Sequence, residues 1–433
     1  MIRSFRCILL SIQNCSKKRK MVRKDMTAQI ILSNQLGIAL ASDTTVTSGQ
    51  KTLQTVSKIV ALPAPHRVAI MLANNVFMAD THVRLLLTEW IATLKSPLKS
   101  LEEYADDFTV WVGKNSKALG FIDATMLELT AHQELQDFYS ATTELRAELK
   151  NRLLGIEDKK SDEFSQEIIK LIEKYDERNF YEHPYHDLTG SKIEELYTSS
   201  GFDVKKMAKE FVQALTEGEK IELPALEDRL VEFIKSSQNR FVSTSSITYF
   251  NFAGFGTQEL WPCHVELKAR SVYGGRLRAA KKVDSPENPM QATTWFPIAQ
   301  QDAMADMLRG LSDERREDVW NMAVATLNEI DGHTEDEKKK FSDRFAERMN
   351  TYFDESFSSN TYQTLQDLSP STLVEFAELL VKIQSLRSAT QSGPVSVGGK
   401  IECLSITKES GTKWVSRMTD GGMVGATELD WLS

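Results

Sequence analysis

The first regular feature of the chain is an alternation of apolar and polar positions with a period of two residues. Residues 27–34 (TAQIILSN) and 36–43 (LGIALASD) are rich in branched apolar side chains. The dipeptide Asn34-Gln35 interrupts them, which is typical of a β-hairpin. Two further strands are predicted over 58–62 (KIVAL) and 67–73 (RVAIMLA), on either side of a proline-containing turn. The beginning of the pattern therefore predicts two pairs of strands.

The period then changes to that of amphipathic helices. Apolar residues at helical spacing predict a helix over 78–95, and Ser100 is a candidate N-cap for a second helix that ends near Val112. Residues 118–240 are more charged and predict several amphipathic helices. These helices are expected at roughly 124–154, 163–177, 203–217 and 225–236.

Strand patterns return over 245–273 and are followed by a helix at 300–311. A second charged helical stretch covers 313–357, and another helix opens at Ser369 or Ser371. The segments GGKIECLSIT and TKWVS predict two closing strands. This order is explained most simply by two antiparallel sheets packed together with a helix pair outside each one. We therefore expect an α+β fold, a four-layer αββα sandwich with an added helical bundle.

The domain boundaries follow from these changes of pattern. Residues 1–26 are interpreted as a propeptide or as a segment upstream of the true start, so that translation begins at Met1 or at Met26. The sandwich is expected to consist of three separate segments, 27–117, 241–312 and 358–433. Residues 118–240 would form a helical insertion, and residues 313–357 a second one.

Composition excludes several classes of protein. The 433 residues carry a net charge of −9, which argues against binding to nucleic acid or to an anionic membrane surface. No apolar run reaches the roughly 18 residues of a membrane span. The widely scattered cysteines predict neither a disulfide framework nor a zinc site, so a reducing, cytoplasmic location without a cofactor is expected. They are Cys7, Cys15, Cys263 and Cys403.

Two local motifs are weaker candidates for chemistry. The segment YEHPYHDL contains Glu182, His183, His186 and Asp187, but its proline breaks any helix that would align the two histidines. A surface loop is therefore expected there, and no metal site. Cys263 and His264 are adjacent on a predicted strand and point to opposite faces, so they cannot act as a nucleophile and its base.

The strongest candidate for chemistry is Thr27. A threonine at a free N-terminus carries its own general base, since an α-amine has a pKa of about 7.7–8.0. Loss of Met26, by methionine removal or by autocleavage, would expose it. Asp43 ends the second predicted strand and Lys58 begins the third. A lysine charge close to the amine would lower the pKa of the amine, and Asp43 would hold Lys58 in place.

The segments around these three residues resemble the first half of a proteasome β-subunit, and look closest to the bacterial HslV and Anbu peptidases. The matching stretches are TAQIIL, GIALASDTTVTSG, SKIVAL and RVAIMLANN, with the family's sixteen-residue spacing between threonine and aspartate. Looser likeness extends the resemblance to 27–112, 245–310 and 370–416. The resemblance implies an αββα fold and amide hydrolysis through an acyl-enzyme on Thr27, with Asp43 and Lys58 as the other catalytic residues.

The resemblance also implies supporting groups. The oxyanion hole would be a backbone N–H at Ala73 or Asn74, and Ser392 or Ser396 would replace the family's supporting serine. Two departures stand out. The family's Ser-Gly pair before the third helix is replaced by the sequence from Ile298 to Gln301, and no aspartate follows the fourth helix.

The leading hypothesis is a self-compartmentalising threonine peptidase, a ring or spiral homo-oligomer that degrades unfolded protein or peptides. It leaves room for an ATPase or adaptor partner recruited by the inserted helices. The altered support residues motivate a second hypothesis, a catalytically inactive structural subunit of the same fold. A third is an amidohydrolase of the same nucleophile class that acts on a small amide and forms no ring.

Overall fold

The computed structural model describes eleven segments of the chain, and all structural statements below refer to them. They are residues 27–48, 51–53, 57–141, 159–178, 187–188, 191–215, 223–241, 247–329, 334–390, 397–419 and 422–425. The interpretation of residues 1–26 as a propeptide or upstream segment falls outside this range and stays a prediction.

The fold is α+β and is built on two large antiparallel sheets. Sheet 1 has the strand order β12 (Thr294–Ala299), β1 (Ala28–Asn34), β2 (Gly37–Asp43), β13 (Ile401–Thr407), β14 (Gly411–Thr419) and β15 (Gly422–Gly425). Sheet 2 has the order β11 (Arg276–Asp284), β10 (Cys263–Tyr273), β9 (Thr248–Phe255), β6 (Arg67–Asn74) and β5 (Ile59–Ala61). Two small ribbons pair β3 (Val46–Ser48) with β4 (Lys51–Leu53), and β7 (Phe77–Met78) with β8 (Thr81–His82).

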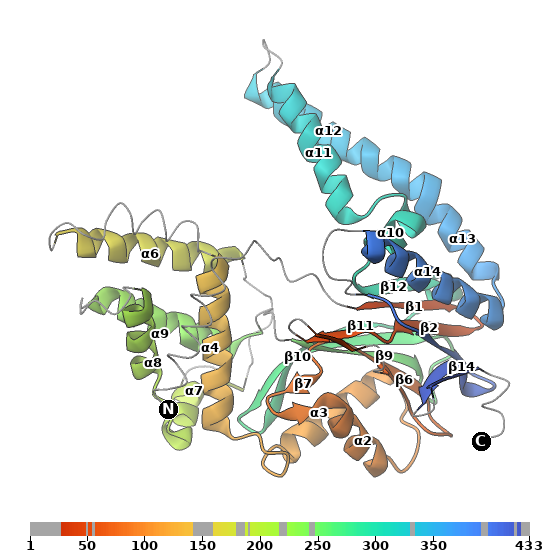
Figure 1. Ribbon diagram of the computed structural model, residues 1–433, viewed down its shortest axis with the longest axis horizontal. Helices are drawn as coiled ribbons and strands as arrows, with labels where there is room; N and C mark the ends of the chain where they lie inside the picture. Colours follow the sequence, from red (N-terminus) through yellow and green to blue (C-terminus); the bar gives the residue numbers. More distant parts are fainter. Residues whose placement is uncertain are drawn as a thin grey trace.

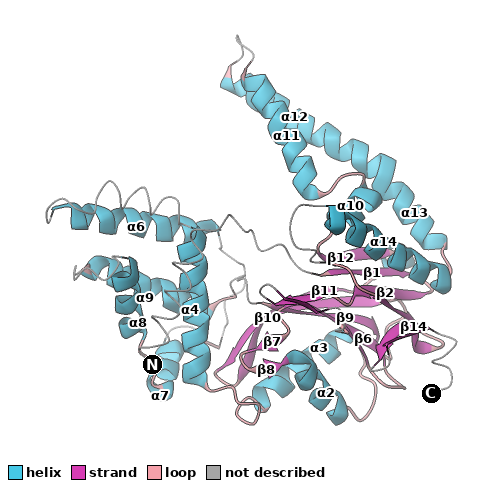
Figure 2. Ribbon diagram, in the orientation of Figure 1, coloured by secondary structure: helices cyan, strands magenta, loops and turns pink. Residues whose placement is uncertain are grey.

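The two sheets pack face to face, as the stacked strands in Figure 2 show. Ile31 and Leu40 of sheet 1 meet Met71 and Phe255 of sheet 2 in one buried apolar cluster. The alternation of apolar residues in β1 and β2 explains this layer, because every second side chain of a strand points to the same face. The other face of β1, with Ile30, packs in a separate cluster against helices.

Helices cover the outer face of each sheet (Figure 1). On sheet 1, α14 (Pro370–Thr390) lies across β1, β2 and β13, with α10 (Asp302–Arg309) beside it. On sheet 2, α3 (Leu101–Lys114) contacts β9, β10 and β11, and α2 (Val83–Thr93) packs against α3. The predicted N-cap is confirmed, since Ser100 Oγ accepts a hydrogen bond from the Glu103 amide at 3.2 Å.

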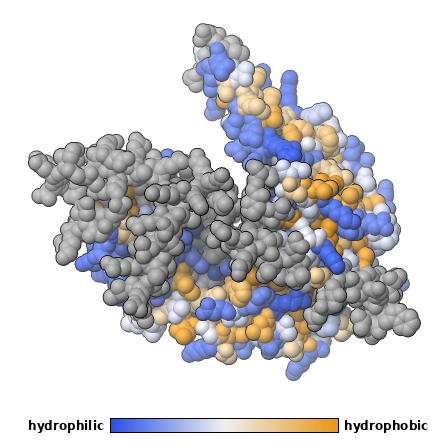
Figure 3. All heavy atoms as spheres, viewed as in Figure 1, coloured by the Kyte–Doolittle hydropathy of each residue, from blue (hydrophilic) through white to orange (hydrophobic). Residues whose placement is uncertain are grey.

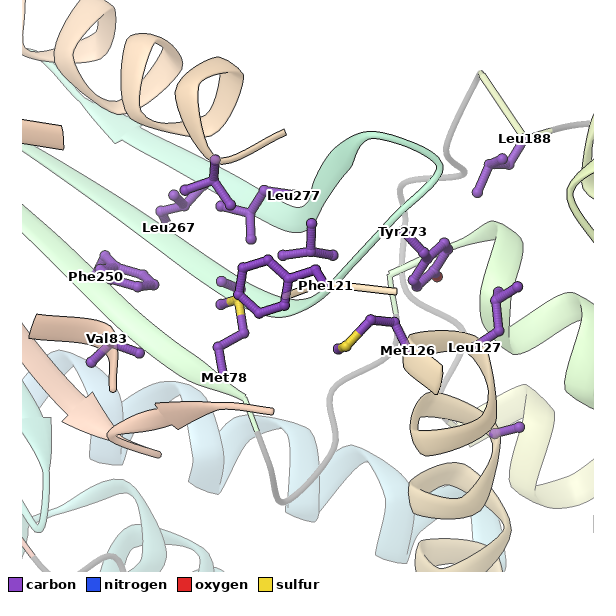
Figure 4. Close-up of a cluster of buried hydrophobic side chains, with 14 of the residues drawn as sticks. Met78, Val83, Phe121, Met126, Leu127, Leu188, Phe250, Leu267, Tyr273 and Leu277 are labelled. Carbon is purple, nitrogen blue, oxygen red and sulfur yellow. The ribbon is translucent and has the colours of Figure 1, made fainter. Parts of the chain in front are cut away.

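The region 118–240 contains helices that lie beside the ends of β10 and β11. They are α4 (Asp123–Ala141), α6 (Lys159–Arg178), α7 (Ser191–Ser200), α8 (Val204–Leu215) and α9 (Pro224–Asn239). Their buried side chains join those of sheet 2 in one continuous cluster. Figure 4 shows this junction, where Met126 and Leu127 of α4 approach Tyr273 of β10. An ion pair between Arg270 of β10 and Glu134 of α4 (3.0 Å) is almost completely excluded from solvent.

The region 313–357 forms an arm that projects away from sheet 1 (Figure 1). It consists of α11 (Asp313–Asn328), α12 (Glu335–Phe353) and the short π-helix η2 (Asp354–Ser358), and α13 (Ser359–Asp367) returns the chain to the sheet. No side chain of α11 is buried. We therefore distinguish this projecting arm, residues 313–358, from the packed helices of 118–240.

Most predicted elements are confirmed, and the differences have physical reasons. The predicted helix at 78–95 begins only at Val83, because residues 77–82 form the β7–β8 ribbon. The strands β11 and β12, a short 3-10 helix η1 (Pro289–Ala292) and helix α7 were not predicted. β11 and β12 lie at edges of the two large sheets, where charged residues and Pro297 are tolerated, and such residues hide the strand pattern. The short strands β3, β4, β7, β8 and β15 were not predicted either. Among the described helices, none is both long and apolar enough to cross a membrane.

Candidate active site

Thr27 lies immediately before β1 and is buried. On one side, β1 pairs with β12, whose last residue Ala299 is opposite Ala28. The amide of Gln300, the next residue, donates a hydrogen bond of 2.8 Å to the Thr27 carbonyl. The backbone of Thr27 is therefore fixed at the start of the strand, and its side chain has a defined direction.

Lys58 brings the three predicted catalytic residues together. Its ammonium group lies within hydrogen-bond reach of Thr27 Oγ1, and donates to Asp43 Oδ1 at 2.7 Å and to the Thr45 carbonyl at 2.6 Å. An ammonium group has three N–H donors, so each of them has one acceptor. Thr27 and Asp43 come from sheet 1, whereas Lys58 leads into β5 of sheet 2. The cluster therefore depends on the packing of the two sheets.

Asp43 accepts hydrogen bonds from backbone amides as well as from its partner Lys58. The amide of Ala28 donates to Oδ1 at 3.0 Å, and the amides of Thr45 and Gly398 donate to Oδ2 at 3.3 Å each. The carboxyl group is completely buried. Backbone donors of this kind compensate the carboxylate for the water that it loses on burial.

Burial shifts the ionisation of both members of the pair. Burial raises the pKa of Asp43, while the charge of Lys58 and the hydrogen bonds to the carboxylate oppose this shift. Burial lowers the pKa of Lys58, and the charges of Asp43 and Glu402 oppose that shift. Burial thus makes the protonated form of Lys58 less stable than that of a solvated lysine, and the two carboxylates counteract this effect.

Glu402 is a site residue that the sequence reasoning missed. It lies on β13, is fully buried, and accepts the Lys58 amide on Oε2 (3.3 Å) and the Met418 amide on Oε1 (3.0 Å). Glu402 therefore fixes the backbone of Lys58 and adds a second negative charge near its ammonium group. A glutamate at a buried position of the apolar segment IECLSI was the available signal.

The strand pairing distinguishes the two predicted oxyanion-hole residues, Ala73 and Asn74, by the direction of their amides. In β6, the Leu72 amide donates to the Lys58 carbonyl, and the Asn75 amide donates to Ile247 on the opposite side. Because successive N–H groups alternate, the Ala73 amide faces β9 and the Asn74 amide faces the side of Lys58. Asn74 also has a positive φ of 66°. This conformation is rare for residues other than glycine, and asparagine adopts it more easily than most.

The predicted supporting serines, Ser392 and Ser396, lie outside the described residues. Where the resembled family has Ser-Gly, Ala299 has a φ of 64° and Gln300 binds the Thr27 carbonyl. Strained backbone is thus present at this position, but Ala299 supplies no hydroxyl.

Of the two weaker candidates, the structure describes Cys263 and His264 and only the last two residues of YEHPYHDL. Asp187 pairs with Arg278 at 2.9 Å, while the rest of the YEHPYHDL segment other than Leu188 is outside the described residues. No cluster of metal-binding side chains occurs in the described part of the chain. Cys263 Sγ lies near Ser285, and His264 Nε2 lies 3.2 Å from Asn251, so these neighbours have different partners.

Comparison of the chain with protein-family models and with curated proteins finds no match.

Proposed function

We propose that the protein is a threonine peptidase of the proteasome type, with Thr27 as the N-terminal nucleophile on a four-layer αββα sandwich. The observation that carries the proposal is the position of Lys58 Nζ, between Thr27 Oγ1 and Asp43 Oδ1. Thr27 and Asp43 are 16 positions apart in sequence, and Asp43 and Lys58 are 15 apart. The three residues come together there from two sheets. Burial of a lysine charge costs free energy. A buried lysine that contacts a threonine hydroxyl is therefore a candidate for a functional role.

The proposed reaction begins with processing before Thr27, which frees its α-amine. Thr27 Oγ1 then attacks the substrate carbonyl, and its proton passes to the α-amine. The negative charge that develops on the carbonyl oxygen is stabilised by the Asn74 amide. The leaving amine takes a proton as the C–N bond breaks, and water hydrolyses the resulting ester on Thr27. The substrate would be an unfolded protein or peptide, cleaved inside a homo-oligomer.

The decisive experiment combines the mature N-terminus with the activity of two variants. Intact-mass analysis should show a chain that begins at Thr27. Thr27→Ala should reduce hydrolysis of fluorogenic peptides by on the order of 10³-fold or more, because the nucleophile is lost. Lys58→Met should reduce it by about 10²–10⁴-fold. Thr88→Ala and Lys95→Ala change exposed residues of the same types at and after α2, and serve as controls.

A uniform mature chain that still carries residues 23–26 would refute the mechanism, since no free amine would be next to the hydroxyl. Activity of Thr27→Ala close to that of the Thr88→Ala control would refute the nucleophile.

Ala299 favours one alternative, a catalytically inactive structural subunit. A residue without a hydroxyl stands where the resembled family supports the threonine amine with serine. If the mature chain begins at Thr27 and still hydrolyses no peptide, Ala299→Ser decides between the two. Activity gained by this variant would identify the missing support group, and continued inactivity would favour the structural role.

A further inference from the structure

A pocket of about 490 Å³ lies at the edge of sheet 2 formed by β5, and its lining begins at Ile59, the residue after Lys58. One wall is formed by β5 and by the turn that follows it, as far as Arg67. The opposite wall is formed by the β13–β14 turn and by Trp414 and Arg417 of β14. Arg84 of α2 also lines the pocket. Two sheets and a helix therefore contribute to one cavity of the size that small ligands occupy.

The charge of this pocket is unusual for a protein with a net charge of −9. Arg67, Arg84 and Arg417 all line it, and within the described residues none of them forms an ion pair with a carboxylate. Glu409 is the acidic side chain in the lining and is exposed. Elsewhere, buried or half-buried arginines such as Arg270 and Arg278 do have carboxylate partners. The pocket thus gathers three guanidinium groups against one exposed carboxylate.

Two of the guanidinium groups are held in fixed positions. Arg84 Nη1 donates to the Ser57 carbonyl at 3.0 Å, and the Arg417 guanidinium lies 5.0 Å from the centre of the Trp414 ring. Burial lowers the pKa of Arg84, and the nearby positive charge of Arg417 lowers it further, while Glu402 opposes the shift. Groups that are already ordered lose less side-chain entropy when a ligand binds. His66 also lines the pocket, and burial lowers its pKa, so it adds little charge at neutral pH.

We propose that this pocket binds a small anion through a carboxylate or phosphate group placed between Arg84 and Arg417. The planar donors of arginine match these two groups in geometry, and a half-buried site strengthens the resulting charge-assisted hydrogen bonds. The Trp414 ring forms an apolar wall for the remainder of the ligand. Arginines elsewhere in the fold pair with carboxylates and so stabilise the structure. The arginines of this pocket form no such pairs in the described residues.

The ligand would contact Arg84 and Arg417, and each of these is linked to Lys58 through one or two other residues. That the ligand affects catalysis through these links rests on the proposed function. Arg84 binds the carbonyl of Ser57, which directly precedes Lys58. Arg417 precedes Met418, whose amide binds Glu402, and Glu402 also binds the Lys58 amide. Occupation of the pocket is therefore expected to alter the position of Lys58 and, with it, the reactivity of Thr27.

Calorimetric titration with inorganic phosphate and, separately, with citrate tests the binding itself. Sodium chloride keeps the ionic strength constant, because non-specific attraction is screened by salt. Saturable binding is expected for the wild type and for Lys413→Gln, which removes an exposed cation from the same strand. Arg417→Gln should weaken binding at least tenfold. Preference for phosphate or for citrate identifies which of the two anionic groups the pocket favours.

Absence of saturable binding to the wild type would overturn the proposal, and so would equal weakening by Lys413→Gln. Circular dichroism checks that Arg417→Gln is folded. If it is not, Arg84→Gln takes its place with the same expected loss. The coupling is tested by peptide hydrolysis with and without the anion in wild type and Arg417→Gln. An inactive enzyme that still binds the anion would refute the proposed function and leave the binding site standing.

Discussion

The two helical regions outside the sheets look alike in sequence and differ in the structure. Both are charged and amphipathic, and both interrupt the resemblance to proteasome subunits. The helices of 118–240 bury large side chains in one cluster with sheet 2, whereas the described side chains of α11 and α12 are half-exposed or exposed. This difference shows that a segment inserted in the sequence can become part of the hydrophobic core. It does so when its apolar side chains pack against a sheet.

The surface of the projecting arm supports this distinction. Figure 3 shows hydrophobic residues in orange among hydrophilic residues in blue along the arm. Several large apolar side chains there are exposed, including Met322, Phe341, Tyr352 and Phe357. Phe341 and Phe345 stack on each other at 6.0 Å, so part of this surface is covered by the arm itself. The arm is held at its base, where Arg316 lies over the Phe353 ring.

Deletion of each region should give the largest contrast. Replacement of 118–240 by a Gly/Ser linker should prevent folding, because it exposes to water the apolar side chains of β10 that these helices cover. Replacement of 313–357 should leave a folded protein with an unchanged melting temperature to within a few degrees. Circular dichroism and thermal melting measure both. A folded protein without 118–240 would show that this region is an accessory module.

Loss of the buried ion pair should have the next largest effect. Glu134→Ala should lower the free energy of unfolding by about 3–5 kcal/mol, since it leaves the Arg270 charge buried and unpaired. The matched change in the arm is Asp336→Ala, which breaks the exposed pair with Lys340 and should cost about 0.5 kcal/mol or less. Urea denaturation measures both, and similar values for the two variants would contradict the distinction.

Truncation of single apolar side chains should follow the same order on a smaller scale. Leu135→Ala in α4 should cost about 2–4 kcal/mol, because it opens a cavity in the continuous cluster. Met322→Ala in α11 should change stability by about 0.5 kcal/mol at most, since 61% of Met322 is exposed. Should Met322→Ala prove as costly as Leu135→Ala, the arm must be covered by a partner, and light scattering would reveal the oligomer.

The smallest expected effect is a dependence on pH within the packed helices. Burial lowers the pKa of His132 in α4, and Glu128 and Glu210 oppose this shift. The folded state therefore disfavours the protonated ring, so its contribution to stability is present above the ordinary value of about 6.5 and is lost as the pH falls. His132→Gln should flatten the decline of the melting temperature below pH 6.5. An identical slope in the variant would show that other groups cause the decline.

The sequence predicted the three proposed catalytic residues better than the residues that hold them in position. Thr27, Asp43 and Lys58 stand at the ends of strongly patterned strands, so their positions follow once the hairpins are recognised. Glu402 and Gly398 lie more than 300 residues further along, and no local pattern links them to Lys58. The Thr45 contact uses a backbone carbonyl, which any residue type could supply. Contacts of this kind depend on tertiary packing, which local periodicity cannot encode.

The same limit applies to the fold. Strong alternation predicted the central strands of both sheets, but β12 escaped notice because an edge strand accepts Pro297. This strand fixes the Thr27 carbonyl through Gln300, so its omission removed one neighbour of the site. The junction of α4 with β10 was hidden for another reason. Helical periodicity shows that a face is apolar, and it does not show which surface covers that face.

The donors around Asp43 and Lys58 also have a consequence for the order of synthesis. Ala28 and Thr45 leave the ribosome early, whereas Gly398 and Glu402 follow more than 350 residues later. A chain that is still being translated can form the hydrogen bond from the Ala28 amide to Asp43, but it lacks the later groups that complete the fixation of the Asp43 carboxylate and the Lys58 backbone. The cluster is completed only when β13 joins β2. If Thr27 is the nucleophile as proposed, its full reactivity would be delayed until β13 has been synthesised and has joined the sheet.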